Sequence, residues 1–150
     1  MLSHLDLDVL RLALIDAEGD RVFPYLDTEQ NITIGIGHNL SGVGISTDVR
    51  DLLFEEDVRD AEDSLDRALP WWTTLNPTRQ RALVELCFNM GIGSEREKHG
   101  LLSFTVTLEH LRAGRYDQAA DGFAHSQWAR QVKARRAQRL AYMIRYGADA

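Results

Sequence analysis

The chain has 150 residues and a formal net charge of −6; 44% of its residues are hydrophobic and 27% are charged, which is ordinary for a soluble globular protein of one domain spanning residues 1–150. No apolar run approaches the 18 or so residues that span a bilayer, and the single cysteine, Cys87, excludes internal disulfides and a cysteine metal site. Acidic residues and Arg11 interrupt the apolar N-terminal segment, so no signal peptide is apparent and we expect folding in the cytoplasm.

The charge is unevenly distributed along the chain. Residues 1–75 contain 5 Lys or Arg against 16 Asp or Glu, and residues 76–150 contain 12 against 7. The asymmetry predicts an acidic face and a basic face. The basic half suits an anionic polymer, but two solvated faces explain the pattern equally well.

The first predicted element is a helix over about residues 4–18. Ser3 followed by Asp6 resembles a capping box, and the apolar residues after it recur at helical spacing. Gly19 comes next and tolerates the positive φ angle that ends many helices. Glu18 is therefore expected at the C-terminal end of this helix.

Residues 19–45 predict a small β lobe. Residues 22–25 are extended around a proline, and residues 32–37 alternate β-branched residues as a strand does. Two short strands in a hairpin are expected, and this hairpin must pack on another element because alone it is marginally stable. A long linking helix is predicted over about residues 47–69, ending at Pro70.

The remainder of the chain, about residues 70–150, is predicted to be helical. Four helices are expected at about 77–91, 103–113, 116–125 and 134–146. The fold class is therefore α+β, with a small β-hairpin lobe joined by a long helix to a mostly α-helical C-terminal lobe. A cleft between the two lobes is the expected ligand site.

Two acidic residues and a hydroxyl surround the predicted hairpin. Glu18 closes the first helix, Asp27 lies in the hairpin turn and Thr33 lies on the second strand. Hydrolysis of a glycosidic bond needs an acid that protonates the leaving oxygen, and an inverting enzyme also needs a base that directs water. A helix C-terminus disfavours negative charge, which suits Glu18 as the acid. Spacing alone leaves the alternative that Glu18 and Asp27 are ordinary helix-end and turn residues.

A resemblance to a known family is carried by residues 16–19 (DAEG), 25–29 (YLDTE) and 33–38 (TIGIGH). It continues through residues 88–91 (FNMG) and 126–128 (SQW), and covers roughly the whole chain in order. The sequence resembles the phage lysozyme family, glycoside hydrolase family 24. The resemblance implies a lysozyme-like fold and cleavage of the β-1,4 bond between N-acetylmuramic acid and N-acetylglucosamine in bacterial peptidoglycan.

The same resemblance implies roles for particular residues. Glu18 matches the family's general acid, Asp27 the carboxylate that orients or activates water, and Thr33 the hydroxyl that helps to hold that water. Arg136 matches an arginine that pairs with the catalytic glutamate. The alignment there needs one inserted residue, so Arg135 is the alternative.

Further positions match residues that support the family's fold or line its sugar groove. His38 matches a histidine that pairs with an acid on the linking helix, here Asp57, and we expect this pair to be structural. The candidate sugar-binding positions are Gly37, Asn39, Phe88, Asn89, Phe104, Thr107 and Gly122. The β lobe is shorter than in the T-even phage members of the family, so a third strand is expected to be missing or minimal.

Other motifs were weighed against these. Trp71 and Trp72 suit a sugar-stacking platform or, in keeping with the usual burial of tryptophan, a packing plug. The chain lacks His-Glu-x-x-His and Cys-x-x-Cys motifs, which leaves a zinc amidase without metal ligands. The basic run at 130–139 suits a nucleic-acid contact or the acidic stem peptides of the wall, but no recognition motif accompanies it.

We therefore expect a muramidase of the endolysin type that needs no cofactor and no metal. Its expected partners are the glycan strands of peptidoglycan and a holin or other membrane-disrupting protein that gives access from the host cytoplasm to the wall. A monomer is expected, without membrane insertion or nucleic acid. The alternatives are a virion-associated lysozyme that penetrates the wall, and a non-catalytic module that binds glycan or nucleic acid.

Overall fold

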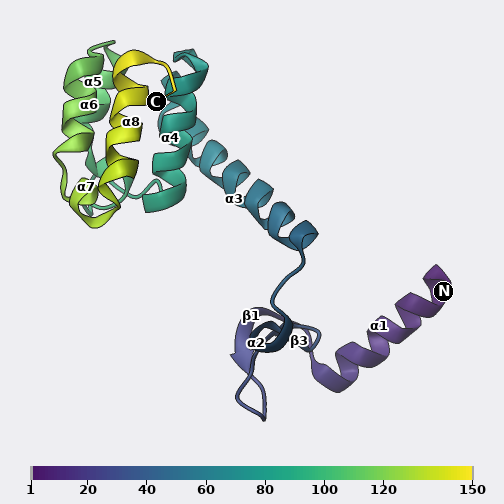
Figure 1. The fold of residues 1–150 in the computed structure, drawn as a ribbon. Coiled ribbons are helices and arrows are strands. Elements are labelled where there is room, and N and C mark those ends of the chain that lie inside the picture. Colours follow the sequence, from purple (N-terminus) through teal and green to yellow (C-terminus); the bar gives the residue numbers. More distant parts are fainter. Residues whose placement is uncertain (1, 150) are drawn as a thin grey trace. The chain divides into compact units, whose positions relative to one another are not determined.

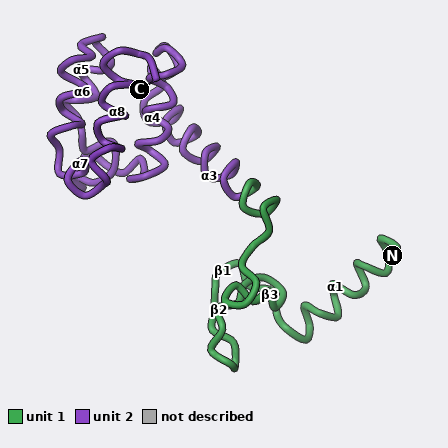
Figure 2. Tube along the Cα trace, viewed as in Figure 1, with its two compact units in different colours: residues 1–52 green, residues 53–150 purple. Residues whose placement is uncertain are grey.

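The computed structural model describes residues 2–149, which form two compact units (Figure 2). The division falls between Leu52 and Leu53, inside the long helix α3. Helices dominate the chain, and a three-stranded antiparallel sheet lies in the first unit (Figure 1). The predicted α+β class is confirmed.

Helix α1, His4–Glu18, begins and ends as its sequence predicts. The Ser3 hydroxyl accepts a hydrogen bond from the backbone N–H of Asp6 at 3.2 Å, and the Asp6 carboxylate accepts one from the Ser3 N–H at 3.3 Å. These two bonds complete the capping box. At the other end Gly19, with φ +84°, donates its N–H to the carbonyl of Ile15 at 2.9 Å. Glu18 is thereby fixed as the last helical residue.

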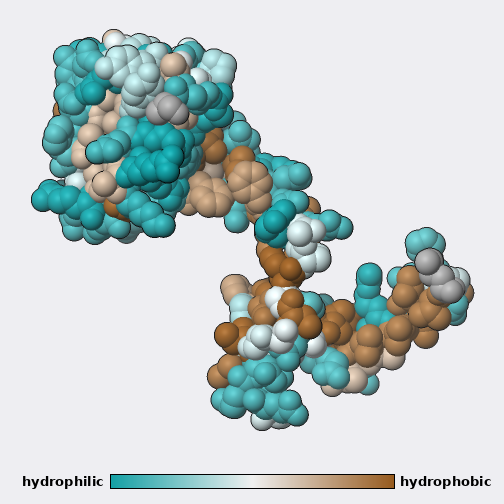
Figure 3. Space-filling view, in the orientation of Figure 1, coloured by the Kyte–Doolittle hydropathy of each residue, from teal (hydrophilic) through white to brown (hydrophobic). Residues whose placement is uncertain are grey.

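The apolar side chains of α1 are not covered within its own unit. The helix has no buried residue, and Leu5 is 74% exposed. Figure 3 shows hydrophobic side chains along α1, whereas the visible face of the second unit is mostly hydrophilic. The part of α1 that matters for the candidate site is its C-terminal end, where Glu18 lies.

The sheet places the residues that follow Glu18. Strands β1 (Arg21–Leu26), β2 (Ile32–Gly35) and β3 (His38–Asn39) pair in that order. Thr33 on β2 lies opposite Tyr25 on β1 and Asn39 on β3. The third strand has only two residues, as the shortened lobe predicts.

A short helix, α2 (Leu40–Val43), follows β3 directly and was not predicted from the sequence. It is a single turn that contains glycine and serine, so helical propensity gives little signal. The Asn39 side-chain oxygen caps it by accepting the N–H of Gly42 at 2.7 Å. This bond ties the end of the sheet to α2.

The second unit consists of helices joined by short connections. They are the remainder of α3 (Thr47–Ala68), η1 (Pro70–Thr74), α4 (Pro77–Met90), η2 (Leu101–Ser103), α5 (Thr105–Arg112), α6 (Tyr116–Ala124), α7 (Gln127–Gln131) and α8 (Ala134–Tyr146). The helices α7, η1 and η2 were not predicted, because segments of three to five residues carry no hydrophobic period.

One apolar core holds the second unit together. Helix α8 packs on α6 and α4 (Figure 1), and its apolar residues recur at helical spacing. The largest fully buried side chains are Leu65, Leu83, Leu86, Leu101, Leu111, Phe123, Leu140 and Ile144. Trp72 is also buried, and its indole N–H donates to Asp66 at 2.7 Å. Trp72 therefore fills space in the core, as one of the two expectations for it holds.

Residues 94–99 form a short hairpin, which the sequence analysis did not foresee. The backbone N–H of Ser94 donates to the carbonyl of His99 at 3.0 Å, and the reverse bond is 3.4 Å. A Cβ on Gly93 would lie 2.0 Å from the His99 oxygen, so only glycine allows this approach. The charged residues of the 94–99 hairpin are thus held at the edge of the helical unit.

Among residues 2–149, none of the helices is long and apolar enough to cross a membrane.

Cys87 gives a test of the packed core. Its side chain is 3% exposed, and burial raises the pKa of the thiol. The thiolate is the reactive form, so we expect Cys87 in the native protein to react with a disulfide reagent on the order of 10²-fold more slowly than in denaturant, because reaction awaits local opening. Absorbance of the released thiolate measures both rates. Equal rates would contradict the buried placement.

Candidate active site

The side chain of Glu18 lies against the backbone of Gly37. A Cβ built on Gly37 would lie 3.4 Å from Cγ and 3.5 Å from Oε2 of Glu18. Gly37 also has φ +73°, a conformation that favours glycine. A side chain at position 37 would therefore be strained by the backbone angle, and its Cβ would be in van der Waals contact with the Glu18 side chain. The structure brings these two predicted site residues together.

Asp27 is held by the hairpin turn between β1 and β2. Its Oδ1 accepts the backbone N–H groups of Glu29 and Asn31, both at 2.8 Å, and its Oδ2 accepts the Asn31 side-chain amide at 3.2 Å. Gln30 adopts φ +65°, which lets the chain fold back around the carboxylate. The turn is built around an acceptor with two oxygens in fixed positions.

These donors lower the pKa of Asp27. The backbone hydrogen bond from Asn31 has the largest effect; desolvation opposes it, and bonds from the Asn31 side chain, the Glu29 backbone and Thr33 add to the lowering. All of these donors favour the ionised form. Asp27 is thus suited to act as a carboxylate rather than as an acid.

Thr33 reaches toward the same carboxylate from strand β2. Its side chain is 3% exposed, and its Oγ1 lies 3.5 Å from Oδ2 of Asp27 and 3.4 Å from the carbonyl oxygen of Asn31. These contacts are long, so the hydroxyl is only loosely engaged. Glu18, Asp27 and Thr33 all belong to the first unit, and the turn places the last two side by side.

His38 bonds within its own lobe. Its Nε2 lies 2.5 Å from the carbonyl oxygen of Gly44, a bond that links β3 to the loop before α3. Asp57 lies on α3 in the second unit. The predicted pairing of His38 with Asp57 stays a prediction.

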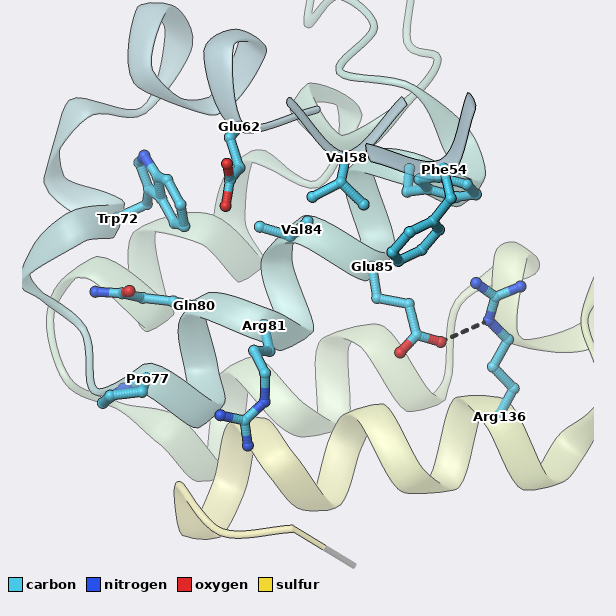
Figure 4. A pocket seen from close by; sticks show the side chains of 11 residues that line it. Phe54, Val58, Glu62, Trp72, Pro77, Gln80, Arg81, Val84, Glu85 and Arg136 are labelled. Carbon is cyan, nitrogen blue, oxygen red and sulfur yellow. Dashed lines mark hydrogen bonds and ion pairs between the residues drawn. The ribbon is translucent and has the colours of Figure 1, made fainter. Parts of the chain in front are cut away.

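Arg136 has a partner that the sequence analysis did not identify. Its Nε donates to Oε1 of Glu85 at 3.0 Å (Figure 4). Arg139, outside that view, donates to the same oxygen at 2.6 Å. Glu85 is the only acid of α4, and most of its near neighbours in the helix are buried. A carboxylate in such surroundings is costly without a cation beside it, so the sequence could have indicated that Glu85 has a basic partner. The pairing of Arg136 or Arg135 with Glu18 stays a prediction.

The sugar-binding candidates of the second unit lie in different surroundings. Phe88 lies on a groove of about 580 Å³ between α3 and α4, with its ring centroid 6.5 Å from that of Phe54. Figure 4 shows Phe54, Val58 and Val84 facing this groove. Phe104 lines a different groove of about 490 Å³ together with Trp128. Asn89 accepts the Trp128 indole N–H at 2.8 Å.

Thr107 and Gly122 meet where α5 packs on α6. Thr107 is buried, and a Cβ on Gly122 would lie 2.3 Å from its Oγ1. Both residues are thus explained by close helix packing. In the first unit, Asn39 uses its side-chain oxygen to cap α2. Sugar binding at these positions stays a prediction.

Within residues 2–149, no cluster of three or more His, Cys, Asp or Glu side chains is arranged to hold a metal ion.

Comparison with known proteins gives consistent matches. The family model described as "Phage lysozyme" matches residues 15–142. The chain is 30% identical to the pre-baseplate central spike protein Gp5 of Enterobacteria phage T4 over 87% of its length. It is 31% identical to an endolysin of Bacillus phage B103 and 32% identical to an endolysin of Salmonella phage P22, each over 71% of its length.

The chain is shorter than several of these relatives. The matched part is 26% of the T4 spike protein, 39% of the B103 endolysin and 72% of the P22 endolysin. Glu18, Asp27 and Thr33 fall within residues 15–142, the range that the family model covers.

The turn around Asp27 predicts a measurable titration. We expect a midpoint below the ordinary 3.8 by NMR, and Asn31→Ala should raise it partway because the side-chain donor is lost and the backbone donor remains. Because the folded-state pKa is lowered, the turn's stabilising contribution is full above pH 3.8 and disappears as the pH falls through the lowered value. An unchanged midpoint in Asn31→Ala would argue against this cause.

The contact between Thr107 and Gly122 can be tested by a double-mutant cycle. Gly122→Ala should destabilise the protein by about 1–3 kcal/mol through overpacking, even though alanine favours a helix. In a Thr107→Ala background the cost should fall by about 1 kcal/mol or more, because the nearest atoms are gone. Denaturant unfolding measures both. Additive effects would mean that the two residues do not touch.

Proposed function

Because the chain belongs to the phage lysozyme family, we propose that it is a muramidase. Its substrate is the β-1,4 bond between N-acetylmuramic acid and N-acetylglucosamine in bacterial peptidoglycan. The observation that carries this proposal is the contrast between two carboxyl groups of one unit: Glu18 at a helix end beside Gly37, and Asp27 within a ring of donors. Environments that separate two carboxyl groups in this way favour an acid and a base.

Glu18 is the proposed general acid. It ends α1, where the carbonyl end of the helix dipole disfavours additional negative charge. A protonated Glu18 donates its proton to the glycosidic oxygen as the bond to the anomeric carbon breaks. The absence of a side chain at Gly37 leaves room for a sugar beside the carboxyl group.

Asp27 and Thr33 are the proposed water-holding pair. The Asp27 carboxylate remains ionised and accepts a hydrogen bond from water, and the Thr33 hydroxyl supplies a second contact. Water attacks the anomeric carbon on the face opposite the leaving oxygen and gives a proton to Asp27. The product then has inverted configuration, as expected when a base activates water directly.

The biological setting has two candidates. The endolysins of phages B103 and P22 favour a lytic role at the end of phage growth, which would require a holin or another membrane-disrupting partner. The similarity to the T4 central spike protein favours a virion-associated role instead. We propose the endolysin role for a monomer acting from the host cytoplasm.

A nucleic-acid module is less well supported. Two arginines of the basic run, Arg136 and Arg139, are engaged by Glu85. Their charge is thus partly neutralised and less available to a phosphate backbone.

The assignment of Glu18 is tested by Glu18→Gln. Loss of a general acid should lower the rate of peptidoglycan cleavage by about 10²-fold or more, with little change in melting temperature because Glu18 is exposed. Release of soluble fragments from purified peptidoglycan measures the rate, and mass analysis identifies the broken bond.

Asp16→Asn is the matched control, since it removes an acid from the same turn of α1. It should retain most activity. Near-wild-type cleavage by Glu18→Gln would remove Glu18 from its role, and cut peptides instead of cut glycan would overturn the proposed reaction.

A further inference from the structure

The three tryptophans of the chain have different surroundings. Trp72 and Trp128 are buried, and their indole N–H groups donate to Asp66 and Asn89. Trp71 is only partly buried. Among the described residues, every buried side-chain nitrogen has a hydrogen-bond partner and none is found for Trp71, so its N–H faces solvent. Packing in the core accounts for Trp72, whose indole N–H has a partner, but it does not account for the indole N–H of Trp71.

Trp71 lines a groove of about 530 Å³ in the second unit, a size within the usual range for a small-ligand site. One wall is the end of α3 and η1, and the other is the face of α5 that carries positions 105, 108, 109 and 112. The 94–99 hairpin contributes Glu95 at the edge. Leu102 of η2 completes the lining, so the groove draws residues from the α3–η1 segment, the 94–99 hairpin, η2 and α5.

The polar groups of this groove are available to a ligand. Thr105, Glu109 and Arg112 stand on α5, and Glu95 comes from the 94–99 hairpin. The side chains of Glu95, Glu109 and Arg112 are exposed, and within residues 2–149 they form no ion pair with the charged residues of neighbouring elements. Two carboxylates and one guanidinium give almost balanced charge, which selects neither an anion nor a strongly cationic ligand.

We propose that this groove binds an N-acetylated sugar of a glycan strand, as a second glycan site separate from the candidate catalytic residues. The indole supplies a flat apolar surface for the C–H face of a pyranose ring. The carboxylates accept hydrogen bonds from sugar hydroxyl or amide groups, and charge-assisted bonds of this kind are strong. The inference rests on the proposed function for its choice of polymer.

A second contact would act on long strands rather than on short fragments. A glycan strand long enough to reach both units can bind both, and the second binding event then occurs at a high effective concentration. The groove should therefore raise the apparent affinity for intact wall without changing the chemical step. Trp71 is accordingly a binding residue and not a catalytic one.

The test is an NMR titration of the full chain carrying Glu18→Gln, with a tetramer of β-1,4-linked N-acetylglucosamine as the probe. We expect the Trp71 indole N–H signal to shift on addition of the tetramer. In the same background, Trp71→Ala should weaken binding to insoluble peptidoglycan at least about fivefold, the usual scale for truncating a tryptophan that anchors an interface. Trp71→Phe should restore part of it, because a ring remains.

Tyr146→Ala is the matched control, since it removes an exposed aromatic side chain from α8, outside the groove. Glu109→Gln gives a second variant of the groove that leaves its packing intact, and it should weaken binding in the same direction. An unmoved Trp71 signal, or equal binding by Trp71→Ala and Tyr146→Ala, would overturn the second site.

Failure of the proposed reaction would be recognised separately. With the otherwise wild-type sequence, Trp71→Ala should raise KM on insoluble wall and leave kcat on short soluble fragments unchanged. If no variant cleaves glycan but the Trp71 signal still shifts, the muramidase proposal fails and the sugar site stands.

Discussion

The candidate active site depends on the close approach of the Gly37 backbone to the Glu18 side chain. This approach requires a helix that ends at a defined residue, and Gly19 with its positive φ supplies that end. It also requires a residue that tolerates a positive φ in the turn between β2 and β3, and Gly37 with φ +73° supplies it. Two glycines thus fix where the carboxyl group of Glu18 lies and leave space beside it. Every proposed step at the glycosidic oxygen follows from that placement.

The second carboxyl group of the candidate site, that of Asp27, has different surroundings from Glu18. Asp27 receives two backbone donors and one side-chain donor from its own turn. Glu18 instead stands at the carbonyl end of a helix. The lobe therefore stabilises negative charge at Asp27 through hydrogen-bond donors that the Glu18 carboxyl group does not have in the described part of the chain. Local geometry accounts for the lowered pKa of Asp27, because its hydrogen-bond donors all lie within six residues along the chain.

In the helical unit, residues of the same type are buried in the core at some positions and lie at the surface at others. Trp72 and Trp128 anchor the core through their rings and their paired N–H groups. Trp71, next in the chain to Trp72, lies on a groove. Glu85 gathers Arg136 and Arg139 beside the core, where an unpaired carboxylate would be costly. Each of these placements is decided by which side of a helix the residue occupies.

The sequence by itself determined the features that depend on neighbouring residues. The capping box at Ser3, the glycine after Glu18 and the turn around Asp27 are local, so α1 and the hairpin could be predicted with Glu18 at the helix end and Asp27 in the turn. The two-residue third strand also followed from the short lobe. Single-turn helices such as α7 were missed, because five residues are too few for a hydrophobic period.

Only the tertiary structure decided the contacts between residues far apart in the chain. Glu85 and Arg136 are 51 positions apart, and Asn89 and Trp128 are 39 apart. Thr107 and Gly122, expected in a sugar groove, are packed against each other at a helix crossing. The division between Trp71 and Trp72 likewise depended on the packing of η1. Sequence spacing predicts local elements along the chain. The pairs named here depend on how whole helices pack, and that packing is determined by shape and burial over the entire unit.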